Sequence, residues 1–292
     1  MNKKYSAVIV TMNPDIERVR SNVESLIRQE FVVIIVDNHS KEPAALRSID
    51  HVCLIELPEN IGIAAALNEG MKVSESMGAE WVLSLDQDTT FSDTLLEEYL
   101  KYLPQLERPG ALSPRIIKRD EKDKGVCNDV IEVIDKCPTS GFFMSVEAWN
   151  AAGRYDEWMF IDYVDYDMCM RLRISGYLIY RINTAFIVQE LGKLRIHPFI
   201  NKIGTITNNS TIKNFSVTYN HSPFRNYYYV RNCLYYIYKY RQNLDVRYEK
   251  KHLLKWEIKK IVLEPHKMGN INAIIRGVKD YRRHIKRKES NN

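Results

Sequence analysis

Short runs of apolar and β-branched residues alternate with amphipathic stretches over the first hundred positions. Four of these runs predict buried strands, at 7–11, 31–37, 52–57 and 81–86. A helix is predicted after the first run, with Asn13 as its N-cap, Pro14 as its first residue and Asp15 in its first turn. A second helix is predicted over Ile63–Ser76. This alternation predicts an α/β fold with a mostly parallel central sheet and helices on both faces.

Polar residues follow each predicted strand, where α/β sheets bind their ligands. These residues are Thr11-Met12-Asn13, Asp37-Asn38, the stretch 58–62, and Asp86-Gln87-Asp88. Asp and Asn are also common in turns, so each group taken singly fits an ordinary turn or cap at least as well. Together they indicate a ligand-binding edge.

The triplet Asp86-Gln87-Asp88 places two carboxylates at positions i and i+2 after an apolar strand. If the chain stays extended there, both carboxylates face the same way and can bind one hard divalent cation. Alternatively, Asp88, Thr89, Thr90 or Ser92 caps a helix over 93–102. The triplet alone leaves both interpretations open.

Three acidic residues, Asp162, Asp165 and Asp167, precede or begin a predicted helix that carries Arg171. Acidic residues near a helix start are stabilised by the helix dipole, which gives the cluster a structural explanation. Aromatic neighbours indicate a partly buried pocket, where a raised carboxyl pKa would suit a general base. Both explanations remain open at this stage.

A basic, tyrosine-rich stretch over 221–241 predicts a helix with Val230 and Ile237 on its packed face. Most of its tyrosines are expected to pack against the body of the protein. Arg225 and Arg231 are candidates for gripping a diphosphate, because a guanidinium binds phosphate oxygens in pairs.

Composition narrows the functional classes. Apolar residues make up 45% of the 292 and charged residues 27%, as in globular proteins. The five cysteines form no CxxC pair, which favours a reducing cytoplasm over a disulfide scaffold or zinc site. No stretch approaches the roughly 18 apolar residues of a membrane span, and the opening apolar run is too short for a signal sequence. The chain has no P-loop, G-x-G-x-x-G fingerprint or G-x-S-x-G elbow.

The order of the motifs resembles glycosyltransferase family 2 with the GT-A fold, and within it the bacterial rhamnosyltransferases. The resemblance runs from Ala7 to about Arg241. Its marks are the strand ending in Thr11, V-D-N at 36–38, N-x-G-x-A-x-A-x-N from Asn60 to Asn68, D-Q-D at 86–88, Ser140-Gly141, the acidic run ending at Arg171, and R-N-Y-Y-x-x-R-N from Arg225 to Asn232.

The resemblance implies an inverting transfer of a sugar, by preference rhamnose, from a dTDP- or UDP-linked donor to a polysaccharide or lipid-linked glycan. It implies Asp165 as general base, with Asp167 as its structural neighbour, and Asp86 and Asp88 as ligands of Mn²⁺ or Mg²⁺. It also implies donor-binding roles for Thr11, Asp37, Asn60, Gly62, Asp86, Arg225 and Arg231. Related sequences carry H-x-L-G where this chain has Gln189-Glu190-Leu191-Gly192, so Gln189, Glu190 or His221 is expected to supply the third protein contact to the metal.

Two other functions are weighed against this one. A sugar-1-phosphate nucleotidyltransferase would need a glycine-rich basic loop after the first strand, and Thr11-Met12-Asn13-Pro14 is no such loop. A non-catalytic nucleotide-sugar-binding protein is disfavoured, because Asp86, Asp88 and Asp165 are all in place.

The C-terminal region differs in charge from the rest. Fourteen Lys or Arg against five Asp or Glu give 247–292 a net charge of +9, which leaves 1–246 at −4. We therefore expect a catalytic domain over 1–241 and a basic helical extension over 242–292.

Within the extension, Leu254, Ile258, Ile261 and Val262 recur at helical spacing among lysines that include Lys259 and Lys260. This pattern fits a helix on the anionic inner face of the cell membrane, or one docked on the body with its lysines in water. Nucleic acid is not an expected partner.

Overall fold

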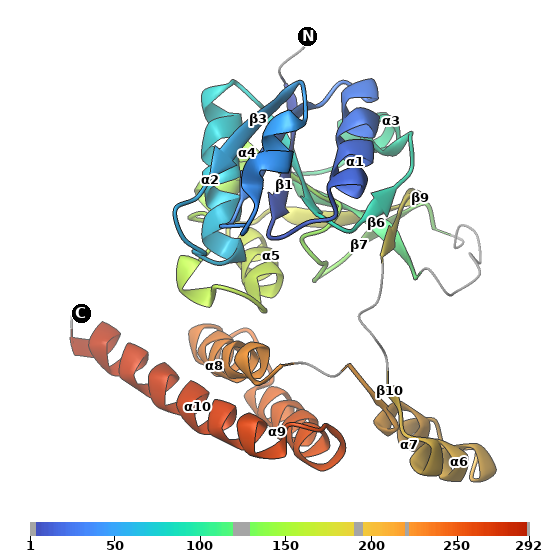
Figure 1. Ribbon diagram of the computed structural model, residues 1–292, viewed down its shortest axis with the longest axis vertical. Helices are drawn as coiled ribbons and strands as arrows, with labels where there is room; N and C mark the ends of the chain where they lie inside the picture. Colours follow the sequence, from blue (N-terminus) through green and yellow to red (C-terminus); the bar gives the residue numbers. More distant parts are fainter. Residues whose placement is uncertain (1–3, 119–128, 190–194, 220–221, 291–292) are drawn as a thin grey trace. The chain divides into compact units, whose positions relative to one another are not determined.

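The structure is a computed structural model that describes residues 4–118, 129–189, 195–219 and 222–290 (Figure 1). The chain divides into two compact units. Unit 1 comprises 1–160 and 164–190, and unit 2 comprises 161–163 and 191–292.

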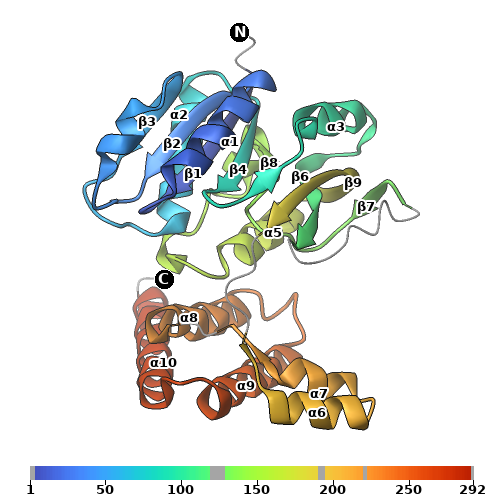
Figure 2. The ribbon, with the colours of Figure 1, turned by 45° about the vertical axis from the view of Figure 1, so that its right-hand side comes forward.

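The first half of the sheet in unit 1 is parallel, in the order β3-β2-β1-β4 (Figure 2). These strands are β1 (Tyr5–Thr11), β2 (Val32–Asp37), β3 (Val52–Glu56) and β4 (Trp81–Asp86). Thr11 pairs with Asp37 in register, and Val10 pairs with Asp86. The four strands predicted from the hydrophobic pattern are confirmed, and their carboxyl ends lie at one edge.

The second half makes the sheet mixed. Its strands are β5 (Thr90–Phe91), β6 (Pro109–Lys118), β7 (Ile131–Val133), β8 (Phe142–Ser145) and β9 (Leu178–Gln189). The order continues β4-β8-β6-β9-β5, and β7 also pairs with β9. Among these pairs only β6 with β9 is parallel. The predicted parallel arrangement therefore holds for the half that carries the ligand-binding edge.

Helices cover both faces of this sheet, as predicted. They are α1 (Ile16–Arg28), α2 (Ile63–Ser76), α3 (Leu95–Tyr102), α4 (Val146–Ala151) and α5 (Val164–Ile174), with 3₁₀ helices at Pro43–Ser48, Leu103–Gln105 and Glu157–Met159. Helices α1 and α3 join one hydrophobic core through Leu26 and Tyr99. On the other face, Gly70 of α2 lies so close to Val8 that an added Cβ would meet it at 2.4 Å.

Two predicted helix starts are wrong. Helix α1 is capped by Asp15, whose carboxylate accepts from the Arg18 N–H, because Asn13 adopts a left-handed φ of 49° in the preceding loop. Helix α3 begins at Leu95 after Thr94, without a side-chain cap. Of the residues expected to cap it, Thr90 belongs to β5, Asp88 and Thr89 precede β5, and Ser92 directly follows β5.

Unit 2 is built mainly from helices. Its elements are β10 (Arg195–Ile196), α6 (Pro198–Ile206), α7 (Ser210–Phe215), β11 (Val217–Thr218), α8 (Pro223–Lys239), α9 (Val246–Leu263) and α10 (Lys267–Ser290). The expected boundary at residue 241 falls inside this unit, because α10 lies along α8 (Figure 1). Tyr227 donates to Asp280 at 2.9 Å across that contact. Within the described residues, no helix is both long and apolar enough to cross a membrane.

Candidate functional site

A buried hydrogen-bond cluster joins the carboxyl ends of β1 and β2. Thr11 Oγ1 donates to Asp37 Oδ1 at 3.0 Å, and Ser40 Oγ donates to the same oxygen. The Ser40 N–H donates to Asp37 Oδ2 at 3.0 Å. Thr11 and Asp37 are both buried. Since a carboxylate offers about four lone-pair positions, these three donors fix the orientation of Asp37 and leave about one position for a ligand.

Two side-chain amides tie the loops after β2 and β3 together. Asn38 Nδ2 donates to Asn60 Oδ1 at 3.0 Å, and Asn38 Oδ1 accepts from the Ile61 N–H at 2.9 Å. Asn60 Oδ1 also accepts from the Gly62 N–H at 3.0 Å. The structure thus brings Asn60 and Gly62 to the edge that holds Asp37. Sequence reasoning assigned no role to Asn38, although it directly follows a strand.

The loop after β4 joins the same edge through Gln87, a residue that sequence reasoning treated only as a spacer. Gln87 Oε1 accepts from the Met12 N–H at 2.8 Å. The Thr89 N–H donates to the carbonyl oxygen of Asp86 at 3.2 Å, which closes a turn. The chain is therefore not extended here, and the predicted alternation that would aim Asp86 and Asp88 the same way is wrong. Asp86 is half-buried and Asp88 is exposed.

The donor set at this turn fits a divalent cation that binds a diphosphate. Within the described ranges, no three His, Cys, Asp or Glu side chains lie close enough together to hold a metal ion. Carboxylates are nevertheless ligands that Mg²⁺ prefers, and Mg²⁺ takes only one or two of them when phosphate oxygens complete its shell. Asp88 presents such a carboxylate to solvent.

One candidate for the third metal contact lies near this turn. Gln189 is the last residue of β9, whose Val188 pairs in register with Thr90 of β5. The antiparallel register therefore places Gln189 beside the end of the D-Q-D turn. The other two candidates, Glu190 and His221, lie outside the described residues.

Gly62 brings the start of α2 against the backbone of Phe160. Its φ is +84°, and an added Cβ would lie 2.6 Å from the Phe160 ring and 2.7 Å from the Phe160 oxygen. The Ile63 N–H donates to that oxygen at 2.6 Å. Because Phe160 precedes the acidic run in the sequence, Gly62 supports the segment that leads to Asp165.

Replacing Gly62 with alanine is expected to lower the free energy of unfolding by about 2–4 kcal/mol, since it adds overpacking to a left-handed backbone. Gly78 is a matched control, because it has the same φ of +84° and nothing within 4 Å of an added Cβ. Gly78→Ala should lower the free energy of unfolding by only about 1–2 kcal/mol, the penalty for placing alanine in a left-handed backbone conformation. Denaturant titration of both variants measures the difference, and equal losses would show that the Phe160 contact contributes nothing.

Helix α5 carries Asp165 and Asp167 in its first turn, in different environments. Asp165 is half-buried, and its Oδ1 accepts from the Tyr166 N–H at 2.9 Å. Asp167 is fully buried and forms an ion pair with Arg171 at 2.8 Å. Arg171 also donates to the Ala152 oxygen at 3.0 Å. Asp167 therefore anchors α5.

The two candidate diphosphate arginines lie in unit 2. Arg225 Nη2 forms an ion pair with Asp162 Oδ1 at 2.8 Å, and its Nε donates to the same carboxylate. Arg231 is only 7% exposed, and its guanidinium carbon lies 4.6 Å from the centre of the Tyr228 ring. Burial lowers the pKa of Arg231. The guanidinium of Arg231 packs against the rings of Tyr227 and Tyr228, and the expectation that it contacts a diphosphate stays a prediction.

A buried polar cluster between α8 and α9 was missed from the sequence. Lys260 Nζ forms an ion pair with Glu257 at 3.1 Å and donates to Asn226, which itself donates to Glu257 at 2.9 Å. Burial lowers the pKa of Lys260, and Glu257 opposes that shift. Lys259 and Lys260 are both buried, so the expectation that they supply charge to a membrane surface is wrong.

Comparison with known sequences gives two matches. Residues 6–143, which run from β1 into β8, match the model of glycosyl transferase family 2. The chain is 31% identical over 251 residues to a dTDP-rhamnosyl transferase, RfbF, of Shigella flexneri, a match that covers 80% of this chain and 79% of that protein.

Comparison with solved structures identifies the fold. A structure of GalNAc-T7 with UDP, GalNAc and Mn²⁺ matches 64% of this chain with a TM-score of 0.54 and 13% identity, and the match spans 44% of that chain. A structure of residues 1–349 of S. aureus TarS with UDP matches 96% of this chain and 92% of that one, with a TM-score of 0.50 and 12% identity. Both structures share the fold of this chain but little of its sequence.

Proposed function

The chain belongs to glycosyl transferase family 2 and has the expected GT-A fold, and from this premise we propose that it transfers rhamnose from dTDP-rhamnose to a glycan acceptor. The observation that carries the proposal is the 31% identity over 251 residues to a dTDP-rhamnosyl transferase. That a nucleotide sugar is the donor follows from the family itself. A UDP-sugar is the second candidate donor, since TarS, whose structure has the same fold, was solved in complex with UDP.

Asp37 and Thr11 are proposed to bind the nucleotide base. The remaining acceptor position of the Asp37 carboxylate would take the imide N–H that uracil and thymine share. The Asn38–Asn60 amide pair holds the neighbouring loop in place, and the Gly62 N–H donates to Asn60 Oδ1 in the same loop. Asp86 is proposed to contact the ribose as well as the metal.

We expect dTDP and UDP to raise the melting temperature of the protein, and GDP and ADP to leave it unchanged. Adenine has no ring N–H to donate, and the N1–H of guanine lies farther from the ribose than the imide N–H of uracil or thymine, so neither purine presents a donor to Asp37 at the same place. Thermal shift assays with the four nucleotides at equal concentration measure this preference. Equal protection by GDP would contradict the role given to Asp37.

Asp86 and Asp88 are proposed to hold Mn²⁺ or Mg²⁺ together with diphosphate oxygens of the donor. When bound, this cation would neutralise charge that develops on the departing nucleoside diphosphate. Arg225 is proposed to assist, and to do so it must exchange the Asp162 carboxylate for a phosphate oxygen. Arg231 is proposed to support this part of α8 by packing against the rings of Tyr227 and Tyr228.

Asp165 is proposed as the general base. It would accept the proton of an acceptor hydroxyl as that oxygen attacks the anomeric carbon from the face opposite the diphosphate. One such displacement inverts the configuration at the anomeric carbon. Asp162 and Asp167 are weaker candidates, because the carboxylate of each is already engaged by an arginine.

One assay separates the three functions considered. The protein is incubated with dTDP-rhamnose, UDP-glucose or UDP-galactose, with Mn²⁺ or EDTA, and released nucleoside diphosphate is measured. A transferase releases dTDP, and more of it with Mn²⁺. In a parallel incubation with dTTP and rhamnose 1-phosphate, a nucleotidyltransferase releases pyrophosphate. A binding protein releases neither dTDP nor pyrophosphate. Absence of dTDP release under every condition, with an acceptor-containing membrane extract present, would overturn the proposal.

The acceptor is proposed to be a polyprenyl-diphosphate-linked glycan on the cytoplasmic face of the membrane. In α9, Leu254, Ile258 and Val262 are exposed, and so are the nearby Lys251 and Lys255. The opposite side of α9 carries the buried Glu257–Lys260 pair. An outward apolar stripe with exposed lysines supports peripheral binding to an anionic membrane.

A further inference from the structure

Helices α6 and α7 form a hairpin that is closed at its base and contacts α9 through a hydrogen bond from Lys259 to the Asn214 oxygen. Strands β10 and β11 pair there, with Arg195 opposite Thr218 and Ile196 opposite Val217. The two helices pack through Gly204, where an added Cβ would lie 2.7 Å from the Lys213 backbone nitrogen. The hairpin is therefore held together by its strands and by the glycine side of α6.

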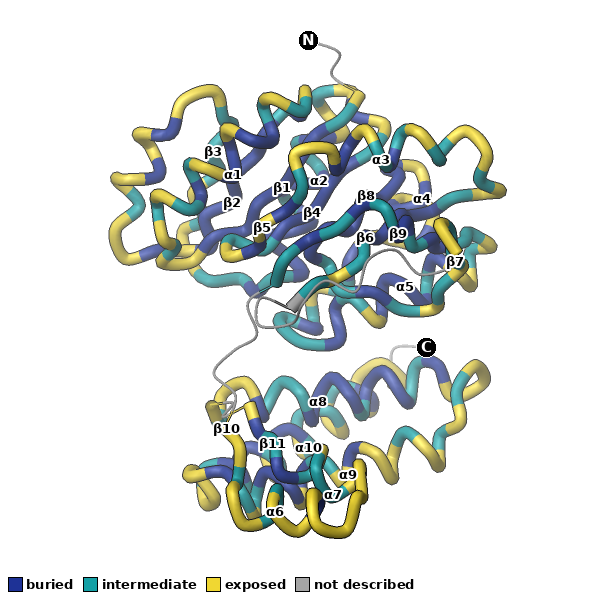
Figure 3. The backbone as a smooth tube through the Cα atoms, turned by 90° about the vertical axis from the view of Figure 1, so that its right-hand side faces the viewer, coloured by how far each residue is buried: buried dark blue, intermediate teal, exposed yellow. Residues whose placement is uncertain are grey.

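The opposite side of α6 exposes large apolar residues. At 100° per residue, Phe199, Ile203 and Ile206 lie within about a third of the helix circumference, and Gly204 lies on the far side. Phe199 is 77% exposed and Ile206 is 74% exposed. Figure 3 shows most of α6 and its turn to α7 as exposed. These apolar side chains are not needed to hold the hairpin.

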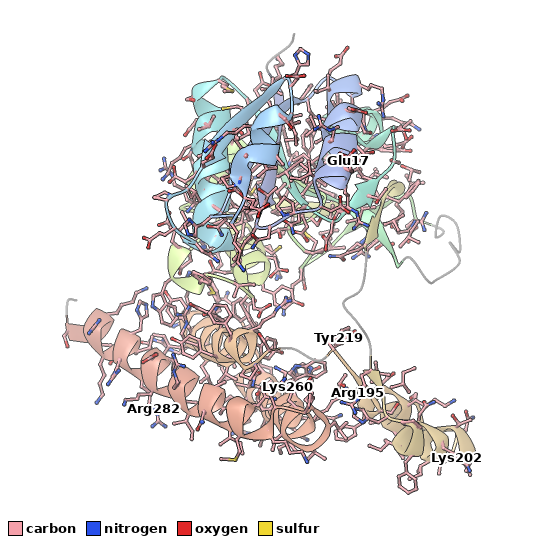
Figure 4. All side chains as sticks on the ribbon, in the orientation of Figure 1. Glu17, Arg195, Lys202, Tyr219, Lys260 and Arg282 are labelled. Carbon is pink, nitrogen blue, oxygen red and sulfur yellow. The ribbon has the colours of Figure 1, made fainter. Side chains whose placement is uncertain are left out.

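The charge of the hairpin has one sign. Residues 195–219 contain Arg195, Lys202 and Lys213 and no Asp or Glu. Lys202 is exposed and lies on the same side of α6 as Phe199, and Figure 4 labels it together with Arg195. An apolar helix face with basic residues at its border is typical of a helix that enters the interface of an anionic bilayer.

We propose that the α6 face formed by Phe199, Lys202, Ile203 and Ile206 inserts into the headgroup region of an anionic phospholipid membrane. The inference rests on the peripheral membrane placement proposed above and assigns its apolar anchor to α6. The basic residues of α9 then supply salt-sensitive attraction, whereas α6 supplies contact that salt does not weaken.

A lipid surface fits this face better than a second copy of the chain does. Two copies related by a twofold axis would bring the same face together. Each copy would place Lys202 against its own counterpart, with no acidic residue in either hairpin to compensate. Anionic headgroups supply the missing opposite charge.

The test is sedimentation of the full chain with vesicles of phosphatidylglycerol and phosphatidylcholine, at low and at high salt. Phe199→Ser combined with Ile206→Ser is expected to lower the partition coefficient about 100-fold, roughly tenfold for each apolar side chain, at both salt concentrations. Both positions are exposed, so the variant should fold. As a second measurement, Phe199→Trp should gain quenching by brominated lipid relative to the unmodified chain.

Val133→Ser combined with Ile174→Ser is the matched control, because Val133 is 61% and Ile174 56% exposed in unit 1. This control should bind vesicles like the unmodified chain. The proposal is overturned if the α6 double variant also does so, and equally if that variant only converts a dimer to a monomer in light scattering. Failure of dTDP release with α6-dependent vesicle binding would instead reject the proposed transferase and leave the membrane anchor in place.

Discussion

Replacing Asp165 with asparagine is expected to reduce sugar transfer by about 10²–10⁴-fold, the usual contribution of a general base. The amide keeps the shape of the side chain and can still accept from the Tyr166 N–H, so α5 should retain its start. Donor affinity should stay near that of the unmodified protein, because the base acts on the acceptor hydroxyl. Calorimetry with dTDP and an assay of transferred sugar measure the two quantities separately.

Two neighbouring carboxylates serve as controls for this result. Asp135 pairs with Arg173 of α5 at 3.0 Å and is 71% exposed in its side chain, so Asp135→Asn should leave transfer unchanged. Asp167→Asn should instead lower the melting temperature, since it leaves the half-buried Arg171 without its partner charge. Full transfer by Asp165→Asn would move the base to Asp162 or Asp167.

The part of the fold that the sequence predicted well is the part determined by local burial. The first four strands are continuous β-branched runs, which have no other stable place than a sheet covered on both faces. The boundaries of α2 agree with prediction at Ile63 and Ser76, because Gly62 precedes the apolar periodicity and Gly78 follows it. The start of α1 was missed because Asn13 binds the Ser40 and Lys41 loop instead of capping the helix.

The candidate site was predictable where its residues follow directly from strand ends, and less so elsewhere. Thr11, Asp37 and Asp86 end neighbouring strands, so the strand order alone brings them together. Gln87 accepts from the Met12 N–H because the chain turns after β4, and the sequence of the triplet does not predict that turn. Arg231 and Lys260 have partners on their own helices, Tyr228 and Glu257. Their burial also depends on packing between helices, which the sequence of one helix does not reveal: Lys260 of α9 lies over the Tyr229 ring of α8, and Gly277 of α10 lies against the backbone of Arg231.

Replacing Asp88 with asparagine is expected to reduce transfer by about 10³-fold, since a metal ion contributes several kcal/mol of charge stabilisation in the transition state. The melting temperature should barely change. Asp88 is exposed, and its contact with Arg18 uses the backbone oxygen, which asparagine retains. Asp50 offers a matched control, because it is an exposed aspartate before β3, at the opposite edge of the sheet.

The metal dependence of dTDP affinity distinguishes a lost cation site from a general disturbance of the loop. In the unmodified protein and in Asp50→Asn, adding Mn²⁺ in place of EDTA should tighten dTDP binding, because a cation held by Asp86 and Asp88 would attract the diphosphate. Asp88→Asn should bind dTDP with the same weak affinity in Mn²⁺ and in EDTA. The base contacts at Thr11 and Asp37 are untouched by the substitution, so this weak binding should still favour dTDP over GDP. If Asp88→Asn keeps both its turnover and its response to Mn²⁺, then Asp88 does not hold the metal, and Asp86 with Gln189 must be tested in its place.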